Sequence, residues 1–398
     1  MRPYTYTHPH APLLAAVLID TMPMFEMDFS AALEELGPGF AFRLANDAPT
    51  PADYLLEQYL PARNRPSYYA DAGNMTIRAT MAGLVAIDGP LPDIGALEES
   101  RFQHGLAKLG GKIVFNEKLQ REMQEHLIRV LALNGGAAGV TLEFMINTVL
   151  NFADKMLRQP MLDTEEYLRG QCLVLGEIDW YFAEQHLEVD YGVPAANKLP
   201  IRTGADAYGG ASSKFWDDVV LLRRRLNRNV QAFIAHGDTI DEIIYNEANK
   251  LDIVAESDDS RSVTVRKFRG SLERPETASQ YGLTLVAYDR EGEVYDLANK
   301  GKTIKLPFVS KGKLVAIGRN ESRGFIVGDG GTSNPDAGNE LGYTHIGPTV
   351  KGQGRLGRFA RAYQPQDHPE QLIGEFEENV LPVLLAPEKV SVATTEMS

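Results

Sequence analysis

The chain has 398 residues and a formal net charge of −14 at pH 7, with 43% hydrophobic and 24% charged residues. These proportions are ordinary for a globular protein, and the acidic balance argues against a broad phosphate-binding surface, which requires clustered lysine and arginine. The single cysteine, Cys172, excludes an internal disulfide framework and a multi-cysteine metal site. The apolar run at residues 11–19 is too short to span a bilayer and precedes no convincing cleavage site, so we expect a protein of the reducing cytoplasm.

Residues 1–50 are rich in proline, alanine and phenylalanine, and within them only residues 29–36 carry a short helical pattern. We interpret this part as an extended arm that becomes ordered by packing on another surface. A second short helical pattern, ADYLLEQYL, covers residues 52–60 and is followed by a polar stretch that proline interrupts.

The clearest strand pattern lies at residues 75–81, where methionine, isoleucine and alanine alternate with threonine and arginine. Residues 112–115, KIVF, are its expected partner. A glycine- and proline-rich connection of about thirty residues separates the two segments, and such a connection is uncommon inside a compact domain. We therefore predict a two-stranded excursion that extends from the body. An isolated ribbon is marginally stable in water, so it requires a neighbouring molecule.

An amphipathic pattern at residues 118–133 ends at Asn134-Gly135-Gly136, and a much longer helical pattern follows over residues 140–181. The first half of the long pattern has one apolar stripe, made of Leu142, Met145, Val149, Phe152 and Met156. Pro160 is expected to kink or break the helix, and Asp163 with Glu166 fits a capping box that restarts it. The apolar face then continues through Leu168, Cys172, Leu175 and Ile178. We interpret Cys172 on this face as a small buried hydrophobe.

Residues 187–199 have a strand pattern. Near Gly204 the sequence pattern changes, and a compact α+β region begins. Helices are predicted at residues 215–226 and 239–249, the second with Asp238 as its N-cap. The predicted strands are residues 230–235, 262–268, 283–288, 302–309, 313–318 and 324–327. A glycine-rich loop covers residues 328–342. The tail has apolar runs at residues 381–385 and 390–392 that are typical of buried strands, and we predict that it pairs back into a sheet beside the long helix and covers the Leu142–Met156 stripe.

Three motifs are candidates for functional sites. Residues 352–357 match GxGxxG, but a proline and a loop precede them and no βαβ unit surrounds them, so nucleotide binding is not predicted. Asp329 and Glu340 have the spacing of an EF-hand loop, but the inner ligand positions fail. His236-Gly237-Asp238 lies at a strand-to-helix turn, although no serine or cysteine nucleophile pattern accompanies it.

The remaining polar clusters give no chemistry either. His8 and His10 lie in the proline-flanked arm without an acidic partner nearby in sequence. The basic runs at residues 223–225 and 351–361 have the charge to contact phosphates or acidic neighbours, but residues 223–225 fit the solvated side of a helix better. We therefore predict no catalytic residues, no cofactor-binding residues, no metal ligands and no enzyme activity.

Several segments, in their order along the chain, resemble the lambda-type (protein E) family of tailed-phage major capsid proteins, which have the Hong Kong 97-like fold. The matching segments are the arm, the excursion, EEYLRGQCLVLGEI, HLEVDYGVPAANKL, FIAHGDTIDEIIYN, LPFVSKGKLVAIG and the tail VLPVLLAPEKVSVATT. The resemblance covers about residues 65–398 and depends most on LRGQCLVLGEI, VDYG and the tail occurring together.

The resemblance implies an α+β fold divided by function. Its parts are an N-terminal arm at residues 1–64, an extended E-loop at 65–117, a P domain at 118–204 with a spine helix at about 140–178, an A domain at 205–360 and a return to the P domain at 361–398.

The resemblance also implies a major capsid protein that self-assembles as hexamers and pentamers into the icosahedral shell around the double-stranded DNA genome of a tailed bacteriophage. Such a protein is located in the virion capsid and is assembled in the host bacterial cytoplasm. The expected partners are copies of itself, scaffolding, portal and decoration proteins, and packaged DNA held without sequence specificity. Two alternatives stay open, an encapsulin-like nanocompartment shell and a nucleotide-binding enzyme that uses the GxGxxG loop.

Overall fold

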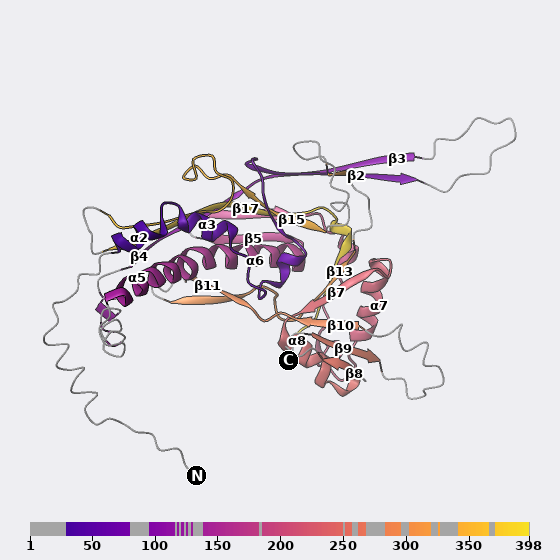
Figure 1. The fold of residues 1–398 in the computed structure, drawn as a ribbon. Coiled ribbons are helices and arrows are strands. Elements are labelled where there is room, and N and C mark those ends of the chain that lie inside the picture. Colours follow the sequence, from indigo (N-terminus) through magenta and orange to yellow (C-terminus); the bar gives the residue numbers. More distant parts are fainter. Residues whose placement is uncertain are drawn as a thin grey trace, which may run out of the picture. The chain divides into compact units, whose positions relative to one another are not determined.

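A computed structural model describes most of the chain, and Figure 1 labels its helices and strands. The described residues are 29–79, 95–115, 118, 121–122, 125, 129, 138–182, 185–249, 251–256, 262–267, 283–295, 302–319, 325–326, 341–365 and 371–397. None of the helices in these residues is long and apolar enough to cross a membrane. The chain forms two compact units. The first comprises Met1–Pro49, Lys108–Leu162 and Pro348–Asn379, and the second comprises Thr50–Ala107, Asp163–Gly347 and Val380–Ser398.

The predicted long helix is present as α5 (Ala138–Phe152), a π-helical turn (Ala153–Arg158) and α6 (Gln159–Val174). The predicted restart at Asp163 is wrong, because the helix continues through Pro160 without a new cap. Proline lacks an N–H donor, and its ring clashes with the preceding turn of a regular α-helix. The wider π turn directly before Pro160, in which the N–H of Gln159 donates to the carbonyl of Asp154, accommodates the proline without ending the helix.

The predicted end of this helix is also wrong. The helix stops at Val174, Gly176 adopts a left-handed φ of 71°, and Ile178 belongs to strand β5 (Glu177–Phe182). A side chain at Gly176 would bring its Cβ within 2.7 Å of Val193, so both the backbone angle and the space require glycine there.

The first unit packs α2 (Ser30–Leu36) and α3 (Phe40–Asp47) against α5, with strands β4 (Ala107–Phe115), β16 (Phe359–Tyr363) and β17 (Leu372–Leu384). Phe115 forms edge-to-face contacts with Phe29 and Phe152, each at 5.9 Å between ring centroids. The helix predicted at residues 29–36 is confirmed, whereas α3 was not predicted.

Three of the five stripe residues lie in this core. Met145, Val149 and Phe152 are buried, but Leu142 and Met156 at the two ends are 41% and 45% exposed. The stripe prediction is therefore correct in its middle and wrong at its ends, because the packed segments cover only about two turns of the helix.

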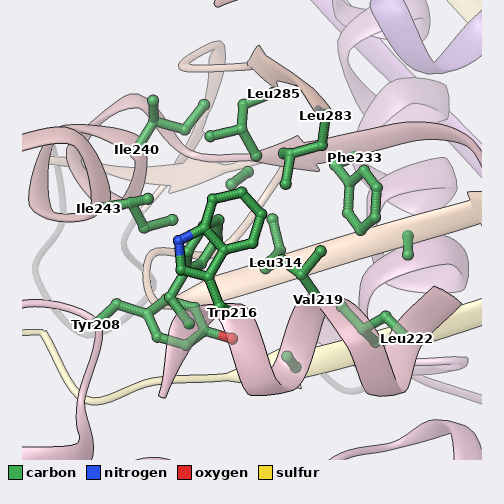
Figure 2. Close-up of a cluster of buried hydrophobic side chains, with 14 of the residues drawn as sticks. Tyr208, Trp216, Val219, Leu222, Phe233, Ile240, Ile243, Leu283, Leu285 and Leu314 are labelled. Atoms are coloured by element: carbon green, nitrogen blue, oxygen red, sulfur yellow. The ribbon is translucent and has the colours of Figure 1, made fainter. Parts of the chain in front are cut away.

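The second unit contains a six-stranded sheet in the order β18-β13-β7-β10-β9-β8. Its strands are β7 (Val230–Ala235), β8 (Leu251–Glu256), β9 (Ser262–Lys267), β10 (Leu283–Ala287), β13 (Lys313–Gly318) and β18 (Val390–Thr394). The helices α7 (Phe215–Arg225) and α8 (Gly237–Tyr245) cover a core centred on Trp216 (Figure 2). The indole N–H of Trp216 donates to the carbonyl of Asn249 at 2.9 Å. Both helices and five of these strands were predicted, although β18 was expected in another sheet, and β8 was not predicted.

Shorter pairs of strands complete the second unit. In parallel register, β1 (Ala62–Asn64) pairs with β15 (Gly342–Gly347). Antiparallel pairs join β5 to β6 (Gln185–Asp190) and β11 (Glu291–Tyr295) to β12 (Thr303–Pro307). A three-stranded sheet has the order β14-β2-β3, made of β14 (Phe325–Ile326), β2 (Tyr69–Ala79) and β3 (Gly95–Gly105).

Two predicted pairings are wrong. Residues 112–115 do not pair with the strand at residues 75–81, since they belong to β4, which pairs with β17. The close approach of β4 to β17 needs glycine, because a Cβ at Gly111 would lie 2.7 Å from the ring of Phe376. The second error concerns the tail. Val390–Thr394 pair with β13 in the six-stranded sheet instead of joining a sheet beside the long helix, whereas the run at residues 381–384 ends strand β17, of which Leu372 packs with Phe152.

Candidate functional site

The two strands β2 and β3 form a long antiparallel ribbon. The register runs from Tyr69 opposite Gly105 to Ala79 opposite Gly95, eleven residue pairs without a bulge. At about 3.4 Å per residue such a ribbon is about 35 Å long. Figure 1 shows the two strands side by side along their whole length. The predicted two-stranded ribbon is present, although β3 and not residues 112–115 supplies its second strand, and its extension onto a neighbouring molecule stays a prediction.

The ribbon is held at its base by a polar contact and a ring contact. The Ser67 hydroxyl donates to the carbonyl of Tyr69 at 2.9 Å, and the carbonyl of Ser67 lies 3.0 Å from Nε2 of His345. Burial lowers the pKa of His345, so this ring is neutral at pH 7. The guanidinium of Arg65 lies over the ring of Tyr343 at 4.6 Å from its centroid. The base is therefore fixed, while the side chains of Tyr68 and Tyr69 beside it are more than half exposed.

The edges of the ribbon remain largely open within the described residues. The short strand β14 pairs with β2 at two positions only, Phe325 opposite Met75 and Ile326 opposite Asn74. On the other side, β3 is the last strand of its sheet. An open strand edge presents a row of N–H and C=O groups that can pair with another chain. This arrangement therefore suits an interaction with a neighbouring molecule.

A cluster of buried charges lies on α6 in the second unit. The guanidinium of Arg169 donates to Glu165 and to Glu166, at 3.0 Å in each case, and to the hydroxyl of Thr344 at 2.8 Å. All three charged side chains have no exposed surface. Oε1 of Glu166 also accepts hydrogen bonds from the Tyr288 hydroxyl at 2.6 Å and from the N–H of Leu56 at 2.7 Å.

Burial dominates the electrostatics of this cluster. Desolvation raises the pKa of Glu166 above its usual range, and the charge of Arg169 offsets the shift only in part. Next to it, the Tyr54 hydroxyl donates to Asp163 at 2.8 Å, and Arg290 donates to the same carboxylate at 3.0 Å. The donors and acceptors of this cluster bind one another, so its geometry fits a structural role. Asp163 and Glu166 were predicted to form a cap. Glu165 and Arg169 were not predicted as functional residues, although their spacing of four residues indicates a pair on one helix face.

The predicted cap of α8 is wrong by two residues. His236 is the N-cap, and its Nδ1 accepts the N–H of Asp238 at 3.2 Å. The carboxylate of Asp238 instead forms an ion pair with Lys311, and this contact lowers the pKa of Asp238. Both groups are therefore engaged in holding the turn.

The glycine-rich loop at residues 352–357 lies between β15 and β16, so a strand and not a helix follows it. Its basic neighbours serve packing in the first unit. Arg355 lies over the ring of Phe42 at 5.4 Å, and the side chain of Arg358 donates to the carbonyl of Ala45 at 3.2 Å. The geometry differs from a dinucleotide-binding turn in the element that follows.

The remaining candidates are Cys172, potential metal ligands, and residues of the arm and of the glycine-rich loop at residues 328–342. Cys172 has no exposed surface, which confirms its predicted burial, and burial raises the pKa of its thiol. Among the described residues, no three His, Cys, Asp or Glu side chains gather in a way that could hold a metal ion. His8, His10, Asp329, Glu340 and most of the helix predicted at 118–133 lie outside the described residues.

Comparisons with known proteins give structural neighbours only. No family model and no curated protein sequence matches the chain. The similar solved structures are mainly phage capsid proteins. One is the putative capsid protein of a prophage of E. coli CFT073, at 10% identity and a TM-score of 0.46, with 89% of this chain and 97% of that chain covered.

Two others are particle shells. The capsid of a native GTA particle is similar at 13% identity and a TM-score of 0.40, with 87% of this chain and 92% of that chain covered. The holo-SrpI encapsulin complex from Synechococcus elongatus PCC 7942 is similar at 10% identity and a TM-score of 0.39, with 89% and 93% covered.

Proposed function

We propose that this chain is the major capsid protein of a tailed bacteriophage, which self-assembles as hexamers and pentamers into an icosahedral shell around double-stranded DNA. The observation that carries the proposal is the ribbon of β2 and β3. It has eleven residue pairs, and β14 covers its outer edge at only two positions among the described residues. A two-stranded ribbon is marginal in water by itself, so it gains stability by lying on a neighbouring subunit.

The segments take the roles that the sequence resemblance implies. The ribbon is the E-loop within residues 65–117, and the helix Ala138–Val174 is the spine of the P domain at residues 118–204. Residues 205–360 form the A domain near the symmetry axes, and residues 1–64 form the arm. Of the returning segment at residues 361–398, β17 belongs to the P domain, whereas β18 extends the sheet of the A domain through its pairing with β13.

The shell wall encloses the DNA and has no sequence-specific affinity for it. With a net charge of −14, the subunit repels duplex DNA, whose phosphates are neutralised by cations from solution. Copies of the chain are its principal partners, and scaffolding, portal and decoration proteins complete the assembly in the host cytoplasm. The proposal gives the chain no enzymatic role.

Electron microscopy of the expressed chain, with and without a scaffolding partner, tests the proposal. Closed shells of uniform diameter are the expected result. Particles recovered from infected cells should contain nuclease-resistant duplex DNA, whereas shells that contain only protein would indicate a nanocompartment instead. Sedimentation that detects only monomers and dimers under all these conditions would overturn the proposal.

A further inference from the structure

A group of arginines gathers at one end of the six-stranded sheet. Arg224 and Arg225 end α7, Arg228 lies in the turn that follows, and Arg319 follows β13. The N–H of Arg319 donates to the carbonyl of Asn229 at 3.0 Å, which places the turn beside the end of β13. We refer to Arg224, Arg225, Arg228 and Arg319 as the arginine patch.

The arginine patch is exposed and uncompensated within the part of the chain that the structure describes. All four side chains are exposed, and none of them forms an ion pair there. The backbone at Lys389 also lies beside the end of β13, since a Cβ at Gly318 would lie 3.3 Å from the carbonyl oxygen of Lys389. The C-terminal dipole of α7 favours cations in its last turn. It does not explain Arg228 or Arg319, which lie outside the helix.

The conformation of the turn also points to a function for the arginine side chain. Asn227 and Arg228 adopt φ angles of 53° and 62°. Asparagine tolerates this left-handed region, but arginine is uncommon there, and glycine would adopt it at lower cost. The chain therefore keeps an exposed arginine at a position where the backbone favours a different residue.

An acidic surface with an exposed aromatic ring lies at the other end of the same strand. Asp241 and Tyr245 are one turn apart on the outer side of α8, and Glu247 follows the helix. Tyr245 is 81% exposed, and Asp241 and Glu247 are exposed without an ion pair in the described residues. We refer to these three residues as the acidic face.

The arginine patch and the acidic face lie at opposite ends of β7. The arginine turn ends directly before Val230, where β7 begins, and α8 starts two residues after Ala235, where β7 ends. A six-residue strand separates them by about 20 Å. Figure 2 shows the same separation, with Ile240 and Ile243 of α8 at one end of the core and Leu222 of α7 at the other.

We infer that the arginine patch of one copy binds the acidic face of the next copy, so that the compact region joins neighbours head to tail. This inference rests on the proposed function, because a head-to-tail contact that closes on itself produces rings. Guanidinium groups fit carboxylates in bidentate pairs and also stack on tyrosine rings. The contact supplies attraction between subunits that otherwise repel one another through their net charge of −14.

Charge reversal tests the contact by sedimentation velocity and electron microscopy. The variant Arg225→Glu with Arg228→Glu should raise the concentration at which half of the protein assembles at least tenfold, since it sets like charges opposite each other. The matched variant with lysine at both positions keeps the charge but loses the bidentate and stacking contacts, so it should assemble less readily than the wild type and more readily than the glutamate variant. Asp241→Lys with Glu247→Lys should fail in the same way as the glutamate variant. All four changes combined in one chain should restore assembly by exchanging the two surfaces.

The possible outcomes distinguish a failure of this contact from a failure of the proposed shell. Circular dichroism melting first verifies that each variant is folded. Wild-type rings or open oligomers that the reversal abolishes would support the contact even if no shell formed. Normal shells from the glutamate variant would overturn the contact and leave the shell proposal standing. Normal assembly together with a loss of retained duplex DNA would also overturn it, because the arginine patch would then bind phosphates.

Discussion

Arg169 and Glu166 lie one turn apart on α6 without any exposed surface, with Nη1 of the arginine 3.0 Å from Oε2 of the glutamate. Glu165 contacts the same guanidinium from one further residue away at 3.0 Å. One cation thus serves two buried carboxylates. Buried carboxylates are tolerated only while their charge is compensated, so this cluster makes the second unit sensitive to changes that affect a single partner.

Replacing Arg169 with methionine should lower the free energy of unfolding by about 3–5 kcal/mol, because two carboxylates then remain buried without their cation. Urea unfolding followed by tryptophan fluorescence measures the effect, since Trp180 and Trp216 both belong to the second unit. Arg224→Met is the control. That side chain is exposed, and its loss should change the free energy of unfolding by about 0.5 kcal/mol or less. Equal effects at the two positions would contradict a stabilising role for the cluster.

The raised pKa of Glu166 predicts a pH dependence of stability with a definite sign. The folded state binds the proton more tightly than the unfolded state, so stability conferred by this group is greatest below the unfolded pKa of about 4.3. It declines as the pH rises from there through the folded-state pKa. The free energy of unfolding of the wild type should therefore fall relative to that of Glu166→Gln over this range. A difference that stays constant with pH would disprove the assignment.

A charge in the last strand should disrupt the six-stranded sheet. Val392 is 5% exposed and lies opposite Val315 in the β13–β18 pair. Burying this valine contributes about 1.5–3 kcal/mol, and an aspartate there must also lose its hydration. Val392→Asp should thus make the protein insoluble or protease-sensitive. Val350→Asp makes the same chemical change at a 78% exposed position and should leave protease resistance unchanged.

Shortening the ribbon separates folding from assembly. Met75 and Glu99 are directly opposed, so residues 76–98 can be replaced by Asn-Gly, which favours a two-residue hairpin turn. The shortened chain should melt within a few degrees of the full chain, because β14 and the lower part of the ribbon are kept. Electron microscopy should detect no shells. Normal shells from this variant would exclude the ribbon as the assembly element.

The spacing of apolar residues correctly predicted the helices and strands whose conformation depends on residues close in sequence. The spacing of apolar residues in α7, β7 and β13 gave bounds within one residue of those observed. The strand β3 escaped prediction because residues 95–105, GALEESRFQHG, lack alternation. Its conformation comes from pairing with β2, which is a non-local effect.

The error at the end of the long helix has a local cause, unlike the error at β3. Ile178 continues the helical spacing of Cys172 and Leu175, but Gly176 ends the helix between them, and this stop was overlooked. The cluster around Arg169 could not be predicted from the local sequence, for a different reason. Its burial depends on Thr344 and Tyr288, which lie more than a hundred residues away in sequence.

The position of β18 in the sheet has a consequence for the timing of folding. Residues 390–394 complete the edge of a sheet whose other strands lie between residues 230 and 318, and the N–H of Leu199 donates to the carbonyl of Val392. Contacts between segments so distant in sequence form slowly and only after both have been synthesised. During translation the ribosome must therefore reach residue 394 before this sheet can close. Until then the edge of β13 stays open, and an open strand edge in an incomplete fold is prone to pair with other chains.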